Sequence, residues 1–145
     1  MASANIYFLT DRILIHPNQR TTAGVEIASS PYIKLGLNAD ATELGAAILA
    51  AISNSHGTVA HPTDWKGLAV SRLKAAGVKT EKAFMAKAVL IQVRTDSAGY
   101  LIEPMFNAGS TGAEKGFLPY AELKISLPLD TSTTKFGEHI INSKP

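Results

Sequence analysis

Residues 88–106, AVLIQVRTDSAGYLIEPMF, say most about the fold. Apolar residues alternate from Val89 to Val93, while Gln92 and Arg94 point the other way, as in a strand with one buried and one polar face. A turn sequence, DSAG, follows, and the chain then returns as a second strand-like run. Two such runs joined by a short turn predict a β-hairpin, and therefore an antiparallel sheet.

Other segments supply further strands. Residues 5–16 are rich in β-branched and aromatic side chains around Asp11-Arg12, and they predict a hairpin or one bulged strand. Segments 24–28 and 32–35 are short candidates, with Pro31 placing the second one at an edge or a strand start. The last strand candidates, 117–120 and 123–127, follow a ten-residue loop from Asn107 to Gly116.

Helices are predicted between these two groups of strands. Asp40 and Glu43 form a capping-box pattern, and apolar residues then recur at helical spacing as far as Ile52. A second helix is predicted from Trp65 to Ala76, where Gly77 provides a C-terminal stop. A short third helix begins at Thr80-Glu81 and includes Phe84.

The fold class that follows is α+β. We expect a single domain over 1–145, with a mostly antiparallel sheet of about six strands and two or three helices inserted in the middle of the chain. Residues 131–142 are left open between helix and coil, because residues 131–134 are poor helix formers and few apolar residues follow.

Composition excludes several classes of function. The chain has 145 residues, 46% hydrophobic and 18% charged, so it is long enough to bury a core without covalent staples. It has no cysteine, which excludes disulfides, thiolate catalysis and cysteine-bearing metal sites. The start of the chain carries no basic cluster, and the longest apolar run, 44–52, is far too short to span a bilayer. We therefore expect a cytoplasmic protein with no membrane partner.

No motif supports catalysis or a cofactor. The loop 109–116 has glycines and Lys115, but its spacing departs from a phosphate-binding loop and a strand follows it. His56 and His61 are five residues apart, whereas metal ligands on one helical face are four apart. No serine stands in a Gly-x-Ser-x-Gly elbow. We expect no enzyme activity, no cofactor, no metal and no small-molecule ligand.

Charge is unevenly distributed along the chain. Residues 66–94 contain seven basic side chains and one acidic one, a net charge of +6, so the seven basic and eleven acidic residues elsewhere give −4. A basic segment of this kind is one signature of nucleic-acid binding, although few aromatic residues are interleaved to stack on bases. A solvated helical face is the interpretation we favour over nucleic-acid binding, and a dipolar surface of this kind could also steer a protein partner.

Trp65 and Tyr32 are the aromatic residues most typical of an interface. Trp65 lies in a first helical turn, and Tyr32 lies beside a proline on a short strand. Tryptophan and tyrosine often anchor protein interfaces. The other interpretation of Trp65, that it closes the core at the edge of its helix, is the expectation we favour.

Three stretches together resemble a known family. They are RTTAGVEIA at 20–28, DATELGAAIL at 40–49, and HPTDWKG at 61–67 together with AAGVK at 75–79. In this order and spacing they are similar to the immunity proteins of bacterial contact-dependent growth inhibition systems, over roughly residues 5–127. The resemblance implies a cytoplasmic, non-enzymatic antidote that forms a heterodimer with the C-terminal toxin domain of a surface exoprotein, often a nuclease, and blocks its active site.

The resemblance supplies no fixed contact residues, so the toxin-binding residues are hypotheses. A ribonuclease has a basic active site, and acidic side chains would then take the place of phosphates. That alternative selects Glu103, Glu114, Glu122 and Asp130. For another kind of toxin, the candidates are Trp65, Tyr32 and Arg20. The runner-up function is a small nucleic-acid-binding module that uses the basic segment 66–94.

Overall fold

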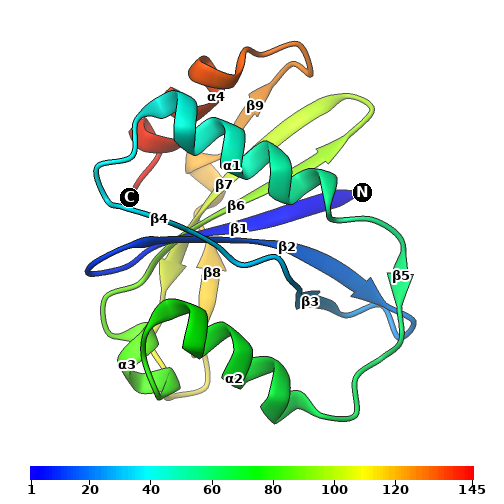
Figure 1. Ribbon diagram of the computed structural model, residues 1–145, viewed down its shortest axis with the longest axis vertical. Coiled ribbons are helices and arrows are strands. Elements are labelled where there is room, and N and C mark those ends of the chain that lie inside the picture. Colours follow the sequence, from blue (N-terminus) through cyan, green and yellow to red (C-terminus); the bar gives the residue numbers. More distant parts are fainter.

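The computed structural model describes residues 1–145 as a curled sheet with helices on both of its faces (Figure 1). The main path of the sheet runs β3-β2-β1-β6-β7-β8, and β4, β5 and β9 pair with strands of this path. All pairings are antiparallel except that of β5 with β2. The strands are β1 (Ala2–Phe8), β2 (Ile13–Thr21), β3 (Glu26–Ala28), β4 (Ile33–Leu35), β5 (Thr58–Val59), β6 (Val89–Asp96), β7 (Gly99–Asn107), β8 (Phe117–Pro119) and β9 (Ile125–Leu127).

Both predicted hairpins are confirmed. β6 and β7 pair along their lengths, and the Asp96 carboxylate accepts a hydrogen bond from the backbone N–H of Ala98 at 2.8 Å inside the turn. Residues 5–16 form a true hairpin of β1 and β2 rather than one bulged strand. β1 also pairs with β6, which places Ile6 opposite both Ile15 and Ile91. The two hairpins therefore join at the centre of the sheet although they lie far apart in the chain.

One face of the sheet, the α1–α4 face, is covered by α1 (Ala41–Ser53) and α4 (Thr133–Asn142). Asp40 caps α1 by accepting a hydrogen bond from the N–H of Glu43 at 2.8 Å, as the capping pattern predicted. The two helices pack closely because Gly45 and Gly137 lack a Cβ, which would overlap the carbonyl oxygens of Thr133 and Ala41. The segment left open between helix and coil, 131–142, is thus a helix that completes this layer.

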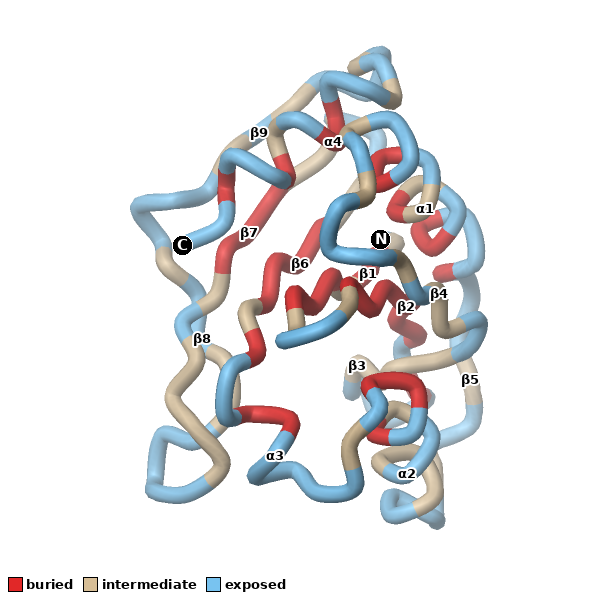
Figure 2. Tube along the Cα trace, turned by 60° about the vertical axis from the view of Figure 1, so that its left-hand side comes forward, coloured by how far each residue is buried: buried red, intermediate tan, exposed pale blue.

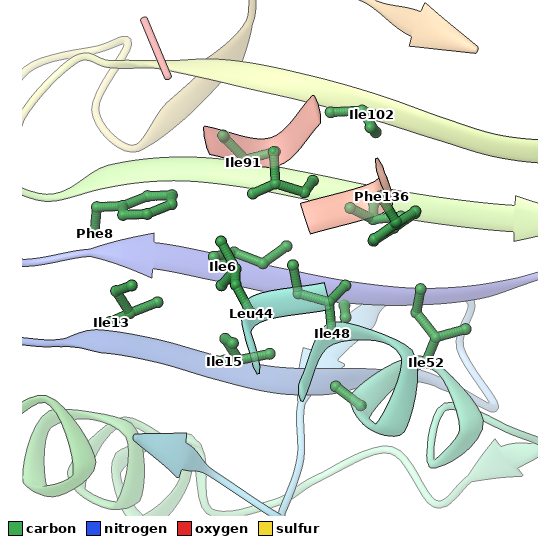
Figure 3. Packing of buried hydrophobic residues seen from close by; sticks show 14 residues of the cluster. Ile6, Phe8, Ile13, Ile15, Leu44, Ile48, Ile52, Ile91, Ile102 and Phe136 are labelled. Carbon is green, nitrogen blue, oxygen red and sulfur yellow. The ribbon is translucent and has the colours of Figure 1, made fainter. Parts of the chain in front are cut away.

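A cluster of buried hydrophobic residues forms the core under α1 and α4 (Figure 3). Alternate residues of the central strands point into it, and most are fully buried. Phe136 of α4 is 0% exposed, and its ring meets that of Tyr100 with centroids 5.0 Å apart. Ile6, Ile15, Ile91 and Ile102 supply the strand side, and Leu44, Ile48 and Ile52 the α1 side.

The opposite face, the α2–α3 face, is covered along only part of its length. α2 (Trp65–Ala76) and α3 (Glu81–Met85) pack Leu73 and Phe84 against Tyr7, Leu14 and Leu90 of the sheet. Gly77 ends α2 with φ of 77°, a left-handed conformation that glycine adopts without strain. Figure 1 shows these two helices on the far side of the strands from α1 and α4.

Burial follows the two layers. The continuous buried stretches of Figure 2 lie along β1, β2, β6 and the inner sides of α1 and α4, whereas the outer turns of the helices and the loops are exposed. None of the four α-helices is long and apolar enough to cross a membrane. The glycine-rich loop 107–116 is closed by a hydrogen bond from Gly116 N–H to the Gly109 carbonyl at 2.9 Å, and it leads into β8 rather than a helix.

Candidate functional site

The part of the α2–α3 face beyond the two helices is polar. Strand alternation places Ser3 and Asn5 of β1, Asn18 of β2 and Gln92 of β6 on this face, side by side across three neighbouring strands. Ser3, Asn18 and Gln92 are buried at 2%, 4% and 7% exposure. We call this surface the polar cleft; its residues are Ser3, Asn5, His16, Asn18, Glu26, Gln92 and Arg94.

Hydrogen bonds connect the amides of the polar cleft to one another. Asn18 Nδ2 donates to Ser3 Oγ at 3.2 Å and to Asn5 Oδ1 at 2.9 Å. Gln92 Nε2 donates to the same Asn5 Oδ1 and to Glu26 Oε1, both at 3.0 Å. Asn5 Nδ2 in turn donates to the Tyr7 hydroxyl at 3.1 Å. The side chains are therefore held in place in the free protein, as a preformed recognition surface requires.

Ion pairs continue this network toward β7. Arg94 lies between two carboxylates, with Nη1 3.3 Å from Glu26 Oε2 and Nε 3.1 Å from Glu103 Oε1. The other oxygen of Glu103 faces Lys124 Nζ at 3.7 Å. Ser3 Oγ also donates to Glu26 Oε2, at 2.9 Å. Glu26, on the short edge strand β3, is thus fixed by partners from both β1 and β6.

His16 carries the one polar side-chain atom of the cleft that is both fully buried and without a hydrogen-bond partner. Its Nδ1 lies 2.9 Å from the Pro17 carbonyl oxygen, which only accepts, so Nδ1 carries the proton and Nε2 is a free acceptor. Nε2 is buried and has no partner. Burial of the ring, opposed by the Pro17 hydrogen bond and aided by the charge of Arg72, lowers the pKa of His16 to about 4. His16 is therefore neutral near pH 7.

Two cavities open on the polar cleft and share Asn18 and Glu26 in their walls. The larger, about 440 Å³, lies between the sheet, the α2–α3 helices and the start of β8. The smaller, about 390 Å³, lies beside the residues 55–58 that follow α1.

Aromatic rings and one ion pair form the wall of the larger cavity opposite the amides. Tyr7 packs edge-on against Phe84 at 4.9 Å and tilted against Phe117 at 5.8 Å between centroids. The Arg72 guanidinium lies 4.4 Å above the Phe84 ring and pairs with Glu81. Burial raises the pKa of the Tyr7 hydroxyl, so this group remains a hydrogen-bond donor.

Three of the predicted toxin-binding residues lie at or beside the polar cleft. Arg20 lines the smaller cavity and donates to the Gly24 carbonyl at 3.2 Å. Tyr32 packs edge-on against His16, with centroids 5.5 Å apart. Glu103 adjoins the cleft, but its side chain is only 10% exposed and both oxygens are paired. It acts first as an internal partner of Arg94.

The other predicted residues are dispersed. Glu114 lies in the exposed loop after β7, Glu122 in the 3-10 turn η1 (Ala121–Leu123), and Asp130 in the turn before α4. Trp65 is 48% exposed and packs against the His61 ring at 5.3 Å. The expectation that Trp65 closes the core is therefore wrong, because α2 buries its C-terminal half instead.

No group of three or more acidic or histidine side chains is arranged to hold a metal ion. His61 Nδ1 lies 3.0 Å from Thr21 Oγ1, and His56 lines the smaller cavity. The two histidines thus have separate local surroundings.

Sequence reasoning missed the central residues of the cleft, namely Asn5, Asn18, Glu26, Gln92 and His16. The available signal was the polar alternation in the strands, which appears as Ser3 and Asn5 in β1 and as His16 and Asn18 in β2. That alternation is typical of a solvated sheet face. Only the strand order shows that these residues meet.

Comparison with known proteins gives a likeness of fold. No protein family and no curated protein matches the sequence. The fold is similar to that of a protein of unknown function, NMB0488 from Neisseria meningitidis, with a TM-score of 0.76 and 16% identity over 98% of this chain and 92% of that one. It is also similar to a chain of the CdiA-CT/CdiI toxin and immunity complex from Yersinia pseudotuberculosis, with a TM-score of 0.72 and 16% identity over 98% and 94% of the two chains.

The class that these observations define is an α+β protein with the fold of a component of a toxin–immunity complex. The likeness extends over nearly the whole of both chains, so the sheet and all four helices take part in it.

Proposed function

We propose that this protein is an immunity protein that binds the C-terminal toxin domain of a contact-dependent growth inhibition exoprotein and neutralises it by covering the toxin's active site. The observation that carries the proposal is the likeness of the whole fold to a chain of a toxin and immunity complex. The sequence motifs that resemble this family support the same function.

The polar cleft supports a binding role. Its amides and carboxylates are ordered by mutual hydrogen bonds before any partner arrives, which lowers the entropic cost of association. An antidote requires such a preformed surface and no catalytic step, so the proposal makes the protein a non-enzymatic binder. It acts in the cytoplasm of the cell that it protects, and its toxin is a nuclease.

Co-expression with the toxin-bearing end of the adjacent exoprotein gene tests this function. We expect growth to be rescued and a one-to-one complex to elute as a single species. A toxin domain of unrelated sequence is the control, and it should be neither bound nor neutralised. If toxicity persists when this protein and the toxin domain are expressed at equal levels, and no complex forms, the proposal is contradicted.

One observation favours a second candidate, a nucleic-acid-binding module. Arg72 and Arg94 of the basic segment are ion-paired, but its five lysines are exposed on or beside α2 and α3. They are Lys66, Lys74, Lys79, Lys82 and Lys87. This candidate predicts RNA or DNA affinity that falls steeply with salt concentration and is lost when these lysines become glutamine. The immunity function predicts the same toxin affinity in that variant to within about tenfold.

A further inference from the structure

The unused hydrogen-bonding atoms at the polar cleft are predominantly acceptors. The amide nitrogens of Asn18 and Gln92 each donate twice within the network, so their N–H groups are fully used. No protein group donates to Asn18 Oδ1 or Gln92 Oε1, and neither is among the fully buried unpartnered atoms, so both remain accessible from the cavity. His16 Nε2 is a further unpartnered acceptor, but it is fully buried. A ligand group that reaches the two amide oxygens must therefore donate hydrogen bonds to them.

Charge in the larger cavity is balanced within the protein. Its lining contains the carboxylates of Glu26 and Glu81, and these pair with the guanidinium groups of Arg94 and Arg72 respectively. The neutral state of His16 adds no positive charge. None of the exposed lysines of α2 and α3 lines either cavity. The free amide oxygens of Asn18 and Gln92, rather than an excess of negative charge, therefore favour a partner side chain that donates hydrogen bonds, such as lysine or arginine.

The aromatic wall suits the stem of a long side chain. Tyr7, Phe84 and Phe117 line the same cavity as the amides. Aromatic faces attract guanidinium and ammonium groups, and Arg72 already lies over Phe84 in this way. A lysine or arginine entering between the rings and the amides would have its stem against carbon and its charged end against oxygen.

We propose that the toxin domain docks on the polar cleft and inserts a lysine or arginine side chain into the cavity between Asn18, Gln92, Glu26 and Phe117. This inference rests on the proposed function and identifies its contact surface. It also replaces the dispersed acidic candidates, because Glu26 and Glu81 are carboxylates that share one cavity with free amide oxygens. A toxin whose active site binds phosphates would supply the inserted cation.

Ala28 provides a test that leaves the network intact. It lies on the edge strand β3, opposite Asn18, and its side chain lines the larger cavity. Replacing it with arginine or glutamate introduces similar bulk with opposite charge at the same place. The matched controls are A46R and A46E, because Ala46 is exposed on α1, which packs on the other face of the sheet.

Affinity for the toxin domain would be measured by calorimetry, with growth rescue as a second readout. We expect A28R to weaken binding by at least about 100-fold, because like charges then face each other at the mouth of the cavity. A28E should keep affinity within about tenfold of the wild type, and both Ala46 variants should match the wild type. Thermal unfolding of each free variant would confirm that it folds.

Two other outcomes would overturn the inference. Equal loss of toxin affinity in A28R and A28E would show that no cation is inserted beside Ala28. Wild-type affinity in both variants would show that the toxin docks elsewhere, and the proposed immunity function would still stand. If the wild-type protein itself fails to bind or neutralise the toxin, the proposed function fails, and the inference fails with it.

Discussion

The two faces of the sheet are built from the same strands but are completed differently. On the α1–α4 face, two helices cover the apolar side chains of β1, β2, β6 and β7, which form one buried hydrophobic cluster with those of the helices. On the α2–α3 face, the helices α2 and α3 cover only the apolar part, and the remainder is a hydrogen-bonded polar surface with two open cavities. The first face stabilises the fold, and the second is the surface on which we propose that the toxin docks.

This division has a physical reason. An apolar face must be fully covered, because each exposed large side chain forfeits about 1.5–3 kcal/mol of burial free energy. A polar face can remain open if its groups bond to one another, as Asn5, Asn18 and Gln92 do. Stability and binding can then change independently. The predictions below test that independence, beginning with the largest effect.

Replacing Phe136 with alanine should give the largest loss of stability. Phe136 is 0% exposed and packs against Tyr100 in the α1–α4 core. Removing a buried phenylalanine costs about 3–5 kcal/mol, measurable as the change in the free energy of unfolding in urea. I141A, on the same helix but with Ile141 39% exposed, should cost less than about 1 kcal/mol. Toxin affinity of folded F136A should be unchanged; a selective loss of affinity would contradict the division between the faces.

The sequence reveals the α1–α4 face more readily than the α2–α3 face. Helix caps such as Asp40 and apolar spacing are local signals, so α1 and the hairpin of β6 and β7 could be predicted. The packing of α4 on α1 could not, because it depends on the close approach at Gly45 and Gly137, which are 92 residues apart. Length and propensity alone made residues 131–142 a weak helix candidate.

The polar cleft was beyond sequence reasoning for a related reason. Asn5 and Gln92 are 87 residues apart in the chain. They meet only because β1, which carries Asn5, pairs with β6, which carries Gln92. Its negative charge made Glu103 a candidate phosphate mimic in the sequence. The sequence does not reveal, however, whether a charged side chain is buried or paired within the protein. The side chain of Glu103 is internal and bonded to Arg94, whereas Glu26, which lines the cavities, was not selected.

The second prediction concerns pH and His16. The pKa of this histidine is about 4 in the folded protein and 6.5 as a reference, so between these values the unfolded chain binds one more proton. The contribution of His16 to the free energy of unfolding is therefore fully present above pH 6.5 and is lost as the pH falls toward 4. The loss is about 1.4 kcal/mol per pH unit and roughly 3 kcal/mol in all. Urea unfolding of the wild type and H16F at pH 7, 6 and 5 measures this difference in slope.

H16F is an informative comparison because it keeps a ring between Tyr7 and Tyr32 while removing the buried unpartnered nitrogen. At pH 7 the variant should lie within about 1 kcal/mol of the wild type, since the lost Pro17 hydrogen bond is offset by removal of an unsatisfied polar atom. Parallel pH dependences in the two proteins would show that His16 is not buried in its neutral form.

The smallest stability effect should come from Asn18, although it is only 4% exposed. N18A removes two hydrogen bonds, but Asn5 Oδ1 still accepts from Gln92, and water can enter from the cavity to reach Ser3 Oγ. The free energy of unfolding should therefore fall by about 1 kcal/mol, well below the cost of F136A. Toxin affinity should fall by more than about tenfold, because the variant lacks an acceptor of the cleft.

The control is N142A, which removes an exposed amide side chain on α4 and should change neither the free energy of unfolding nor the toxin affinity. An N18A protein as unstable as F136A would mean that the polar cleft is itself part of the core, and a stable N18A with full affinity would mean that the toxin lies elsewhere.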